Sequence, residues 1–253
     1  MGFRYIDNLV KPENLNQFLE LVDLAAGSGK DTNNVFDLSD RLNKSRPMQL
    51  CIQAIQRDPA SIQLIKERYV GPPYDLEALL QLPKDSLGWT YATVLSTLGY
   101  DPQFYRTPPA FNSDAEYISF RVYKTHDLHH ILTGFMLDNL GELGVISFTA
   151  AQTRFPAFLF LDILSLLGHF FTADKLYSED LEPTEQGKTL GYAVDLIARG
   201  LKIGQAAKPV FPIKWEEGLE RPIEEWRQEL NIQPAKEGPY SWYSHPQLLA
   251  AIS

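Results

Sequence analysis

The chain has little cysteine and a shortage of positive charge. Cys51 is the only cysteine among 253 residues, so an intrachain disulfide is excluded, which fits a reducing compartment. Lysine and arginine number 23 against 32 aspartates and glutamates, which gives a net charge of -9. This balance argues against nucleic-acid binding by the chain as a whole and against attachment to anionic lipid by charge alone. A chain of this length can bury a core large enough to fold without disulfides or a metal.

The first ten residues, MGFRYIDNLV, lack the features of a targeting segment. No charged stretch precedes a long apolar run, and the composition is not the Ser- and Arg-rich composition of a transit peptide. We therefore expect neither a signal peptide nor a transit peptide.

The sequence also lacks alternating apolar and polar stretches long enough to predict a sheet. Apolar residues instead recur at the spacing of helices, over residues 13–26, 82–102, 114–131, 184–205 and 221–230. Asp58 followed by Pro59 is a typical helix start. The polar residues 27–46 are a candidate mobile linker, but the apolar segments on both sides indicate one core. We predict a single all-α, multi-helix domain over residues 1–253.

The longest apolar run is FPAFLFLDILSLLGHFF, residues 155–171. It is shorter than the roughly 20 residues of a membrane-spanning helix, and it contains Asp162, whose burial in lipid is costly. Two alternatives remain for it: a fully buried core helix, or a helix that lines an apolar cavity or touches a membrane surface. Both require apolar residues all around the helix, so composition does not separate them.

Three of the five histidines lie in the segment KTHDLHHILTGF, residues 124–135. On a helix, His126 and His130 are four positions apart and share a face, as in helical zinc motifs. Asp127 lies within an arc of roughly 100° of both and could complete the ligand set or orient a histidine. His129 points roughly 100° away from His130. A solvated helical face or a contact at the helix end is the simpler alternative.

A further ligand must come from outside this segment, and Glu142 is the candidate. On one continuous helix it would lie roughly 18 Å beyond His130 along the axis, out of reach. However, Thr133-Gly134 and Asn139-Leu140-Gly141 are plausible helix breakers. If the first helix stops near residue 132 and the chain turns back, Glu142 lies in the first turn of the next helix, where the dipole favours a carboxylate.

This mixed nitrogen and oxygen ligand set suits zinc, and also magnesium, manganese or iron. With few soft ligands, it is typical of a site that keeps one position open for water or substrate. The remaining histidines, His169 and His245, are isolated, and we expect them to be satisfied or exposed side chains.

The pattern H-D-x-x-H-x(11)-E, formed by HDLHH and Glu142, resembles the signature of the coenzyme Q biosynthesis protein four family. Flanking stretches are also similar to that family, over roughly residues 58–232. They are LPKDSLGWTYATVL, YISFRVYKTHD, GELGVISFTAAQTRFP and KWEEGLERPIEEWRQELNI.

The resemblance implies an all-α protein that is needed for making ubiquinone and binds a divalent metal, usually zinc. Carried over, the metal ligands are His126, Asp127, His130 and Glu142. The family is also held to bind long isoprenoid chains, to contact membranes peripherally and to form dimers, and it is linked to oxidative decarboxylation at ring carbon one of the quinone precursor. Mitochondrial members carry a targeting extension that this N-terminus does not show. We therefore expect a bacterial homologue, cytoplasmic or peripheral on the inner membrane face.

A prenyl tail needs a long apolar groove with polar chemistry at one end. The run at 155–171 follows the Glu142 helix directly, so it is a candidate wall for a cavity or tunnel leading to the metal. The expected tail-binding residues are Phe155, Phe158, Leu159, Leu161 and Leu166. For the head group, Arg121 or Tyr123 could contact a carboxylate or phosphate, although Arg121 could instead pair with Glu116 or Asp114.

Three functions fit these features. The first is a metal-dependent enzyme that acts on a prenylated hydroxybenzoate or another prenylated quinone precursor. The second is a non-catalytic isoprenoid-binding scaffold that organises quinone-biosynthesis enzymes. The third, an unrelated His-Asp metal phosphohydrolase, is disfavoured because those enzymes draw ligands from several separated helices and the chain has no second His/Asp cluster.

Overall fold

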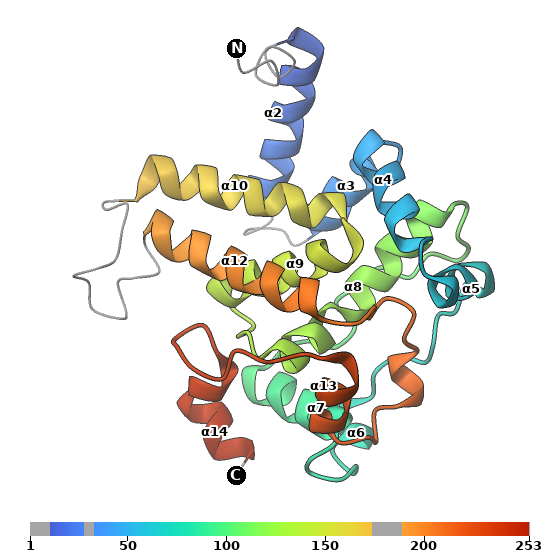
Figure 1. Ribbon diagram of the computed structural model, residues 1–253, viewed down its shortest axis with the longest axis vertical. Helices are drawn as coiled ribbons and strands as arrows, with labels where there is room; N and C mark the ends of the chain where they lie inside the picture. The colour runs from blue at the N-terminus through green and yellow to red at the C-terminus, as the bar shows by residue number, and fades with distance from the viewer. Residues whose placement is uncertain (1–10, 28–32, 174–188, 253) are drawn as a thin grey trace.

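The computed structural model describes residues 11–27, 33–173 and 189–252, and in these ranges it is helical with no strand. This confirms the all-α prediction (Figure 1). Two short 3-10 turns, Trp215–Glu217 and Trp242–Ser244, and two isolated β-bridges complete the regular structure in these ranges. The α-helices are α2 (Pro12–Gly27), α3 (Asn33–Leu42), α4 (Arg46–Ile55), α5 (Pro59–Glu67), α6 (Leu76–Leu79), α7 (Leu87–Leu98), α8 (Asp114–Thr133), α9 (Asn139–Thr153), α10 (Pro156–Thr172), α12 (Leu190–Ala206), α13 (Ile223–Leu230) and α14 (Pro246–Ile252).

Several helices begin where the sequence supplies a capping side chain. Asp58 accepts a hydrogen bond from the N–H of Ser61 at the start of α5, as predicted. Ser113 does the same for Glu116 at the start of α8, and Asp138 accepts from two N–H groups at the start of α9. Each cap satisfies donors that the first helical turn leaves unpaired, so these side chains fix where each helix starts.

Helix α9 lies near the centre of the bundle, between α8, α10 and α12 (Figure 1). Its packing against α12 is close because α12 presents glycine. A Cβ on Gly200 would lie 2.1 Å from the carbonyl oxygen of Gly144, and one on Gly204 would lie 2.5 Å from that of Phe148. The buried apolar residues form two clusters. One joins α3, α4 and α5 to α8, α9 and α10, and the other joins α7, α13 and α14 to the end of α8. Helices α8 and α9 contribute to both clusters, so they link the described helices into one unit.

The suggestion of a mobile linker at 27–46 needs correction for the part that the structure describes. Residues Asn33–Leu42 form α3, and Ser45 caps α4. Phe36, Leu38 and Leu42 are buried in the core, which ties α3 to the rest of the domain. The polar residues around these apolar positions form the exposed face of a short amphipathic helix, and residues 28–32 lie outside the described ranges.

Two other expectations are only partly met. The apolar run at 155–171 forms α10, but only its first half is buried, and Ile163, Phe170 and Phe171 are 56%, 58% and 74% exposed. It is therefore not a fully buried core helix. The C-terminal region contains the predicted helix at Ile223–Leu230 and also α14, which the sequence pattern did not reveal. Within the described ranges, none of the helices is both long and apolar enough to cross a bilayer.

Candidate metal centre

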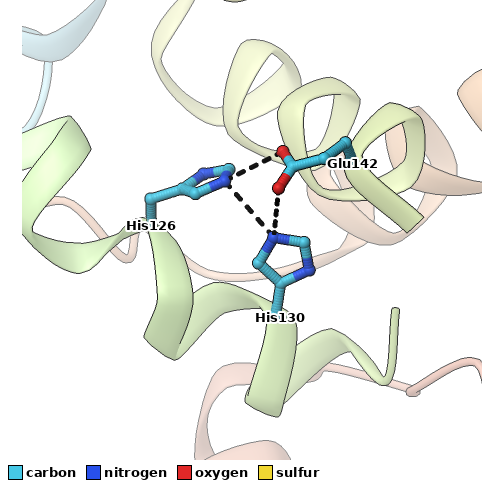
Figure 2. Close-up of side chains that lie close together, drawn as sticks. All are labelled: His126, His130 and Glu142. Carbon is cyan, nitrogen blue, oxygen red and sulfur yellow. Dashed lines mark hydrogen bonds and ion pairs between the residues drawn. The ribbon is translucent and has the colours of Figure 1, made fainter. Parts of the chain in front are cut away.

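The end of α8 and the start of α9 bring two histidines and a glutamate together. His126 and His130 project from the same face of the last two turns of α8. The helix ends at Thr133, and Glu142 lies in the first turn of α9. The short connection from Gly134 to Asp138 reverses the chain, so the carboxylate faces both imidazoles (Figure 2).

The three side chains converge on one point. The Nε2 atom of His126 lies 3.0 Å from Oε2 of Glu142, and Nε2 of His130 lies 3.2 Å from Oε1. The two Nε2 atoms are 3.3 Å apart. A tetrahedral ion with bonds of about 2.0–2.1 Å requires its ligand atoms to be about 3.3 Å apart, which is close to what is observed. Among the described residues, this is the one group of three or more potential ligands that could hold a metal ion.

Two glycines make this turn possible. Gly134 has a positive φ of +84°, and its N–H donates to the carbonyl oxygen of His130, which closes α8. A Cβ at Gly141 would lie 1.8 Å from the carbonyl oxygen of Met136, which no side chain tolerates. The glycines that the sequence marked as helix breakers are therefore the residues that place Glu142 within reach.

His126 and Glu142 shift each other's pKa values so that each charged form is favoured. Burial raises the pKa of the Glu142 carboxyl, but both histidines and their hydrogen bonds outweigh burial and hold the pKa below its usual range. Burial lowers the pKa of His126, and the Glu142 carboxylate outweighs this and raises it. Glu142 is therefore an anion at neutral pH, and its carboxylate can accept a hydrogen bond or bind a cation.

One of the two histidines has a hydrogen-bond partner at Nδ1, which fixes its tautomer, and the other does not. Nδ1 of His130 lies 3.2 Å from the carbonyl oxygen of Phe135. An N–H at this position leaves the Nε2 lone pair free to face an ion between the three side chains, which is the arrangement that metal-binding histidines adopt. Nδ1 of His126 is buried without a hydrogen-bond partner among the described residues. The donor set thus fits a divalent ion, with the orientation of His130 fixed by the main chain.

The fourth predicted ligand, Asp127, is not part of this convergent group. It lines the same cavity as His126 and Glu142. Burial raises the pKa of its carboxyl, and the two histidines oppose that rise. The structure therefore brings together three of the four residues in the motif and places the fourth beside them.

His129, which the sequence analysis set apart, lies on another face of α8. Its Nδ1 atom is 3.2 Å from Oγ1 of Thr149, and its ring packs against Phe148 and Trp215. Burial lowers its pKa to about 3, so the ring is neutral. His169 also lies outside the convergent group, with Nδ1 2.7 Å from the carbonyl oxygen of Ser165.

Arg121 does not line the cavity, and it is 1% exposed. Its guanidinium donates to Glu216 at 2.9 Å and to the carbonyl oxygen of Ile213 at 3.0 Å. The two pairings expected as alternatives are also absent, because Asp114 pairs with Arg68 and Glu116 accepts from Asn112. The real partner lies 95 residues further along the chain, where no sequence pattern points to it. Arg121 therefore ties α8 to the segment around Glu216, on a side of the helix that does not line the cavity.

Tyr123 does line the cavity, but its hydroxyl is already engaged. The oxygen lies 2.6 Å from Oγ of Ser39 and donates to the carbonyl oxygen of Val35 at 3.1 Å. Its ring packs edge-on against Phe155 and Phe158. Tyr123 thus offers the cavity a ring surface and ties α8 to α3.

The cavity beside the histidines has a volume of about 830 Å³. Helices α2, α3, α8, α9 and α10 contribute to its wall, which is mostly apolar. Of the five predicted tail-binding residues, Phe158 and Leu161 line it, whereas Phe155, Leu159 and Leu166 do not. The wall also includes residues that the sequence analysis missed, namely Val22, Ala25, Val35, Leu143, Ile146, Leu164, Leu167 and Phe171.

Little of this wall was readable from the sequence. Leu161, Leu164, Leu167 and Phe171 follow Phe158 at steps of three or four and spread over an arc of about 180° around α10, and the run is apolar elsewhere as well. The contributions of α2 and α3 carry no signal either, because periodicity does not say which helices meet.

These features define a class of protein: an all-helical domain in which a two-histidine, one-glutamate cluster presents one histidine and the glutamate to an apolar cavity. The family described as "Coenzyme Q (ubiquinone) biosynthesis protein Coq4" matches residues 24–236. The chain therefore belongs to this family of ubiquinone biosynthesis proteins, as its sequence motif indicated.

Individual relatives agree with this assignment. The mitochondrial ubiquinone biosynthesis protein COQ4 of Coccidioides immitis is 30% identical over 184 residues, which are 71% of this chain and 59% of that protein. The human mitochondrial homologue is 29% identical over 191 residues, which are 74% of this chain and 66% of that protein. The matched region thus spans about three-fifths of the length of the first of these relatives.

A crystal structure from the bacterium Nostoc punctiforme, whose description assigns it provisionally to ubiquinone biosynthesis, has the same fold. The TM-score is 0.70 at 25% identity, over 85% of this chain and 95% of that one. A bacterial protein of this fold supports the expectation of a bacterial homologue.

Proposed function

We propose that the chain binds a prenylated precursor of ubiquinone, or of a related quinone, and acts on its head group. The prenyl tail would lie in the apolar cavity, and the head group would lie at a divalent metal held by His126, His130 and Glu142. The observation that carries this proposal is that His126 and Glu142 line the same cavity as the apolar side chains of α10. Zinc is the first choice for this ligand set, with magnesium, manganese or iron as alternatives.

The charge of the cavity wall supports a role for a cation. The described lining residues include Asp101, Asp127, Asp138 and Glu142, but no lysine or arginine. A hydroxybenzoate carboxylate entering this region would meet four acidic side chains and no lysine or arginine, and carboxylates repel each other at short range. A bound divalent ion would offset that repulsion, so we expect precursor binding to depend on metal.

The reaction we propose is oxidative decarboxylation at ring carbon one of a prenylated hydroxybenzoate, with molecular oxygen as the two-electron oxidant. The carboxyl group leaves as carbon dioxide, a hydroxyl group from water takes its place on the ring, and oxygen is reduced to hydrogen peroxide. A bound divalent ion would supply Lewis-acid stabilisation of negative charge on the head group. His126, His130 and Glu142 hold that position, while Phe158, Leu161 and the other apolar residues fix the tail and exclude water. Asp127 lies beside the three ligands and would join them, or contact the head group, when the site is loaded.

The second candidate is a non-catalytic scaffold that presents the precursor to other quinone-biosynthesis enzymes. Exposed apolar residues at the end of α10 favour it, because Phe170 and Phe171 lie near the cavity and are largely exposed. Such a surface fits peripheral contact with a membrane, a partner enzyme or a second copy in a homodimer. In this case the metal would hold the head group without catalysing its conversion.

Incubation with a synthetic prenylated 4-hydroxybenzoate separates the two candidates. The protein would be loaded in parallel with zinc, manganese or iron, and each sample incubated with and without oxygen before mass spectrometry. Loss of carbon dioxide by the wild type, but not by Glu142→Gln, supports the enzyme. Metal-dependent binding without conversion supports the scaffold, and the absence of both contradicts the proposed function.

A further inference from the structure

The last two turns of α8 carry both histidines of the proposed metal site, near a helix end that needs hydrogen-bond donors. An α-helix leaves its last four carbonyl groups without partners inside the helix. In α8 these belong to residues His130 to Thr133, because the helix ends at Thr133. The turn that follows cannot satisfy all of them, so the remaining donors must come from elsewhere.

They come from the C-terminal region of the chain, residues 227–242. Arg227 donates from Nε to the carbonyl oxygen of Leu132 at 2.9 Å and from Nη2 to that of Ile131 at 2.7 Å. Trp242 donates from Nε1 to the carbonyl oxygen of His130 at 3.1 Å. Two side chains therefore hold three consecutive carbonyls at the end of the ligand helix.

Main-chain groups of the same region complete the arrangement. The N–H of Ala235 donates to the carbonyl oxygen of Thr133 at 2.7 Å, and the N–H of Trp242 donates to that of Gly134 at 3.1 Å. The N–H of Met136 donates to the carbonyl oxygen of Tyr240 at 2.7 Å. The turn between His130 and Glu142 is thus bound along its length to the C-terminal region.

Both side chains are suited to a fixed position. Arg227 and Trp242 are each 2% exposed, so water does not compete for the carbonyl groups to which they donate. A guanidinium at a helix C-terminus is also favoured by the helix dipole. Trp242 lies beyond residues 24–236, the part of the chain that the family model matches, so this contact is not a feature of the matched family region.

We propose that Arg227 and Trp242 are positioning residues of the metal centre. Neither lines the cavity or belongs to the convergent group, and they act by fixing the main chain at His130 and the turn that places Glu142. Partners beyond the ligands of a metal typically change its affinity about 10- to 100-fold. Because these two act through the backbone, we expect the lower end of that range. The inference rests on the metal site of the proposed function.

Trp242→Phe tests the proposal, since phenylalanine keeps a six-membered aromatic ring but loses the five-membered ring with its N–H, a loss of volume that the control must match. The chain offers a matched control in Trp226→Phe. Trp226 is also buried, and its Nε1 donates to the carbonyl oxygen of Gly218 at 3.1 Å, away from the metal ligands. Zinc affinity would be measured by competition with a chromophoric chelator. We expect it to weaken about 10-fold for Trp242→Phe and to stay within about 2-fold of wild type for Trp226→Phe.

Hydrogen exchange of the metal-free protein provides a readout that does not require metal. In Trp242→Phe the amide protons of Gly134 and Met136 should exchange faster than in Trp226→Phe, because the turn is held less firmly. If Trp242→Phe does not fold, Arg227→Lys provides the same comparison, since lysine keeps the charge but cannot hold two adjacent carbonyls in the same geometry.

The outcomes separate this inference from the proposed function. A wild type that binds no zinc contradicts the metal site, and faster exchange in Trp242→Phe would still support the positioning of the turn. Equal zinc affinity and equal exchange at Gly134 in the two tryptophan variants would overturn the inference, even if the wild type binds zinc tightly.

Discussion

Nε2 of His130 lies 3.2 Å from Oε1 of Glu142, although 12 positions separate the two residues in the sequence. Between them the chain ends one helix, turns and begins the next. The proposed metal centre therefore depends on this turn as much as on its three convergent side chains, and changes to the turn should alter the site without replacing any of the three.

Glu142→Gln and Asp127→Asn should differ in their effect on zinc affinity. Glu142 is one of three convergent groups, and the amide that replaces it is a poorer ligand without charge, so we expect a loss of more than about 100-fold, above the range for outer partners. Asp127 lies beside the group, so Asp127→Asn should lose no more than about 10-fold. Chelator competition measures both, with the exposed Glu225→Gln as control. Equal losses for the two variants would make Asp127 a full ligand.

Gly141→Ala should destabilise the protein, because its Cβ would lie 1.8 Å from the carbonyl oxygen of Met136. We expect a loss of roughly 3 kcal/mol or more in the free energy of unfolding, in the upper range for single substitutions. Gly168→Ala is the matched control, since a Cβ there meets nothing within 4 Å. In a helix interior it should stabilise by about 0.5–1 kcal/mol. Chemical denaturation measures both, and similar effects would contradict the packing described for the turn.

The buried carboxyl group of Asp162 should make the stability of the protein depend on pH. Burial raises the pKa of its carboxyl to about 7, while a hydrogen bond from Ser147 opposes the rise. Between about pH 4 and 7 the folded protein keeps a proton that the unfolded chain releases, so the free energy of unfolding falls as pH increases. The whole effect is at most about 4 kcal/mol at about 1.36 kcal/mol per pKa unit.

Asp162→Asn should remove this dependence, because the amide does not titrate and can still accept from Ser147. Urea unfolding at pH 4.5, 6 and 7.5 would show the variant gaining stability relative to wild type as pH rises. A constant difference across these values would mean that Asp162 is ionised throughout.

Filling the cavity should block binding of a prenyl tail. Leu161→Trp places a larger ring in the cavity wall, and we expect affinity for a prenylated hydroxybenzoate to fall at least about 10-fold, or about 1.4 kcal/mol. Ile163→Trp is the control, because Ile163 lies on the same helix, is 56% exposed and does not line the cavity. Fluorescence titration measures both. Loss of binding in both variants would point to an effect on α10 as a whole.

The exposed end of α10 should contribute to membrane contact. Replacing both Phe170 and Phe171 by serine removes two exposed rings, and each ring buried in lipid contributes about 1.5–3 kcal/mol. Flotation with vesicles of neutral phospholipid should show at least about 10-fold weaker binding. Leu249→Ser, which changes a 49% exposed residue on α14, is the control, since Figure 1 shows α14 at the opposite end of the molecule from α10. Unchanged flotation of the double variant would assign this surface to a protein partner.

The sequence was informative where local chemistry decides the structure. The spacing of His126 and His130 on one helical face, the glycine at 134 and the position of Glu142 in the next helix are all local features, and the structure has each of them. The cap at Asp58 was predictable for the same reason.

What could not be predicted depends on contacts between distant parts of the chain. Arg121 has its partner in Glu216, and the apolar positions of α10 split into cavity wall, core and exposed surface according to which helices pack against it. The packed helix α3 was mistaken for a linker because its buried residues are few and its exposed ones are polar. Helical periodicity shows that a face is apolar, but not what covers it.

The contacts between α8 and the C-terminal region also bear on how the protein is made. The carbonyl groups at the end of α8 find their side-chain donors 95, 96 and 112 residues later in the chain. At a synthesis rate of about 5–20 residues per second, the ribosome needs on the order of 5–20 seconds to supply them. Once Glu142 has been made, the nascent chain holds all three residues of the candidate metal centre, but for most of that interval it lacks the groups that fix their turn.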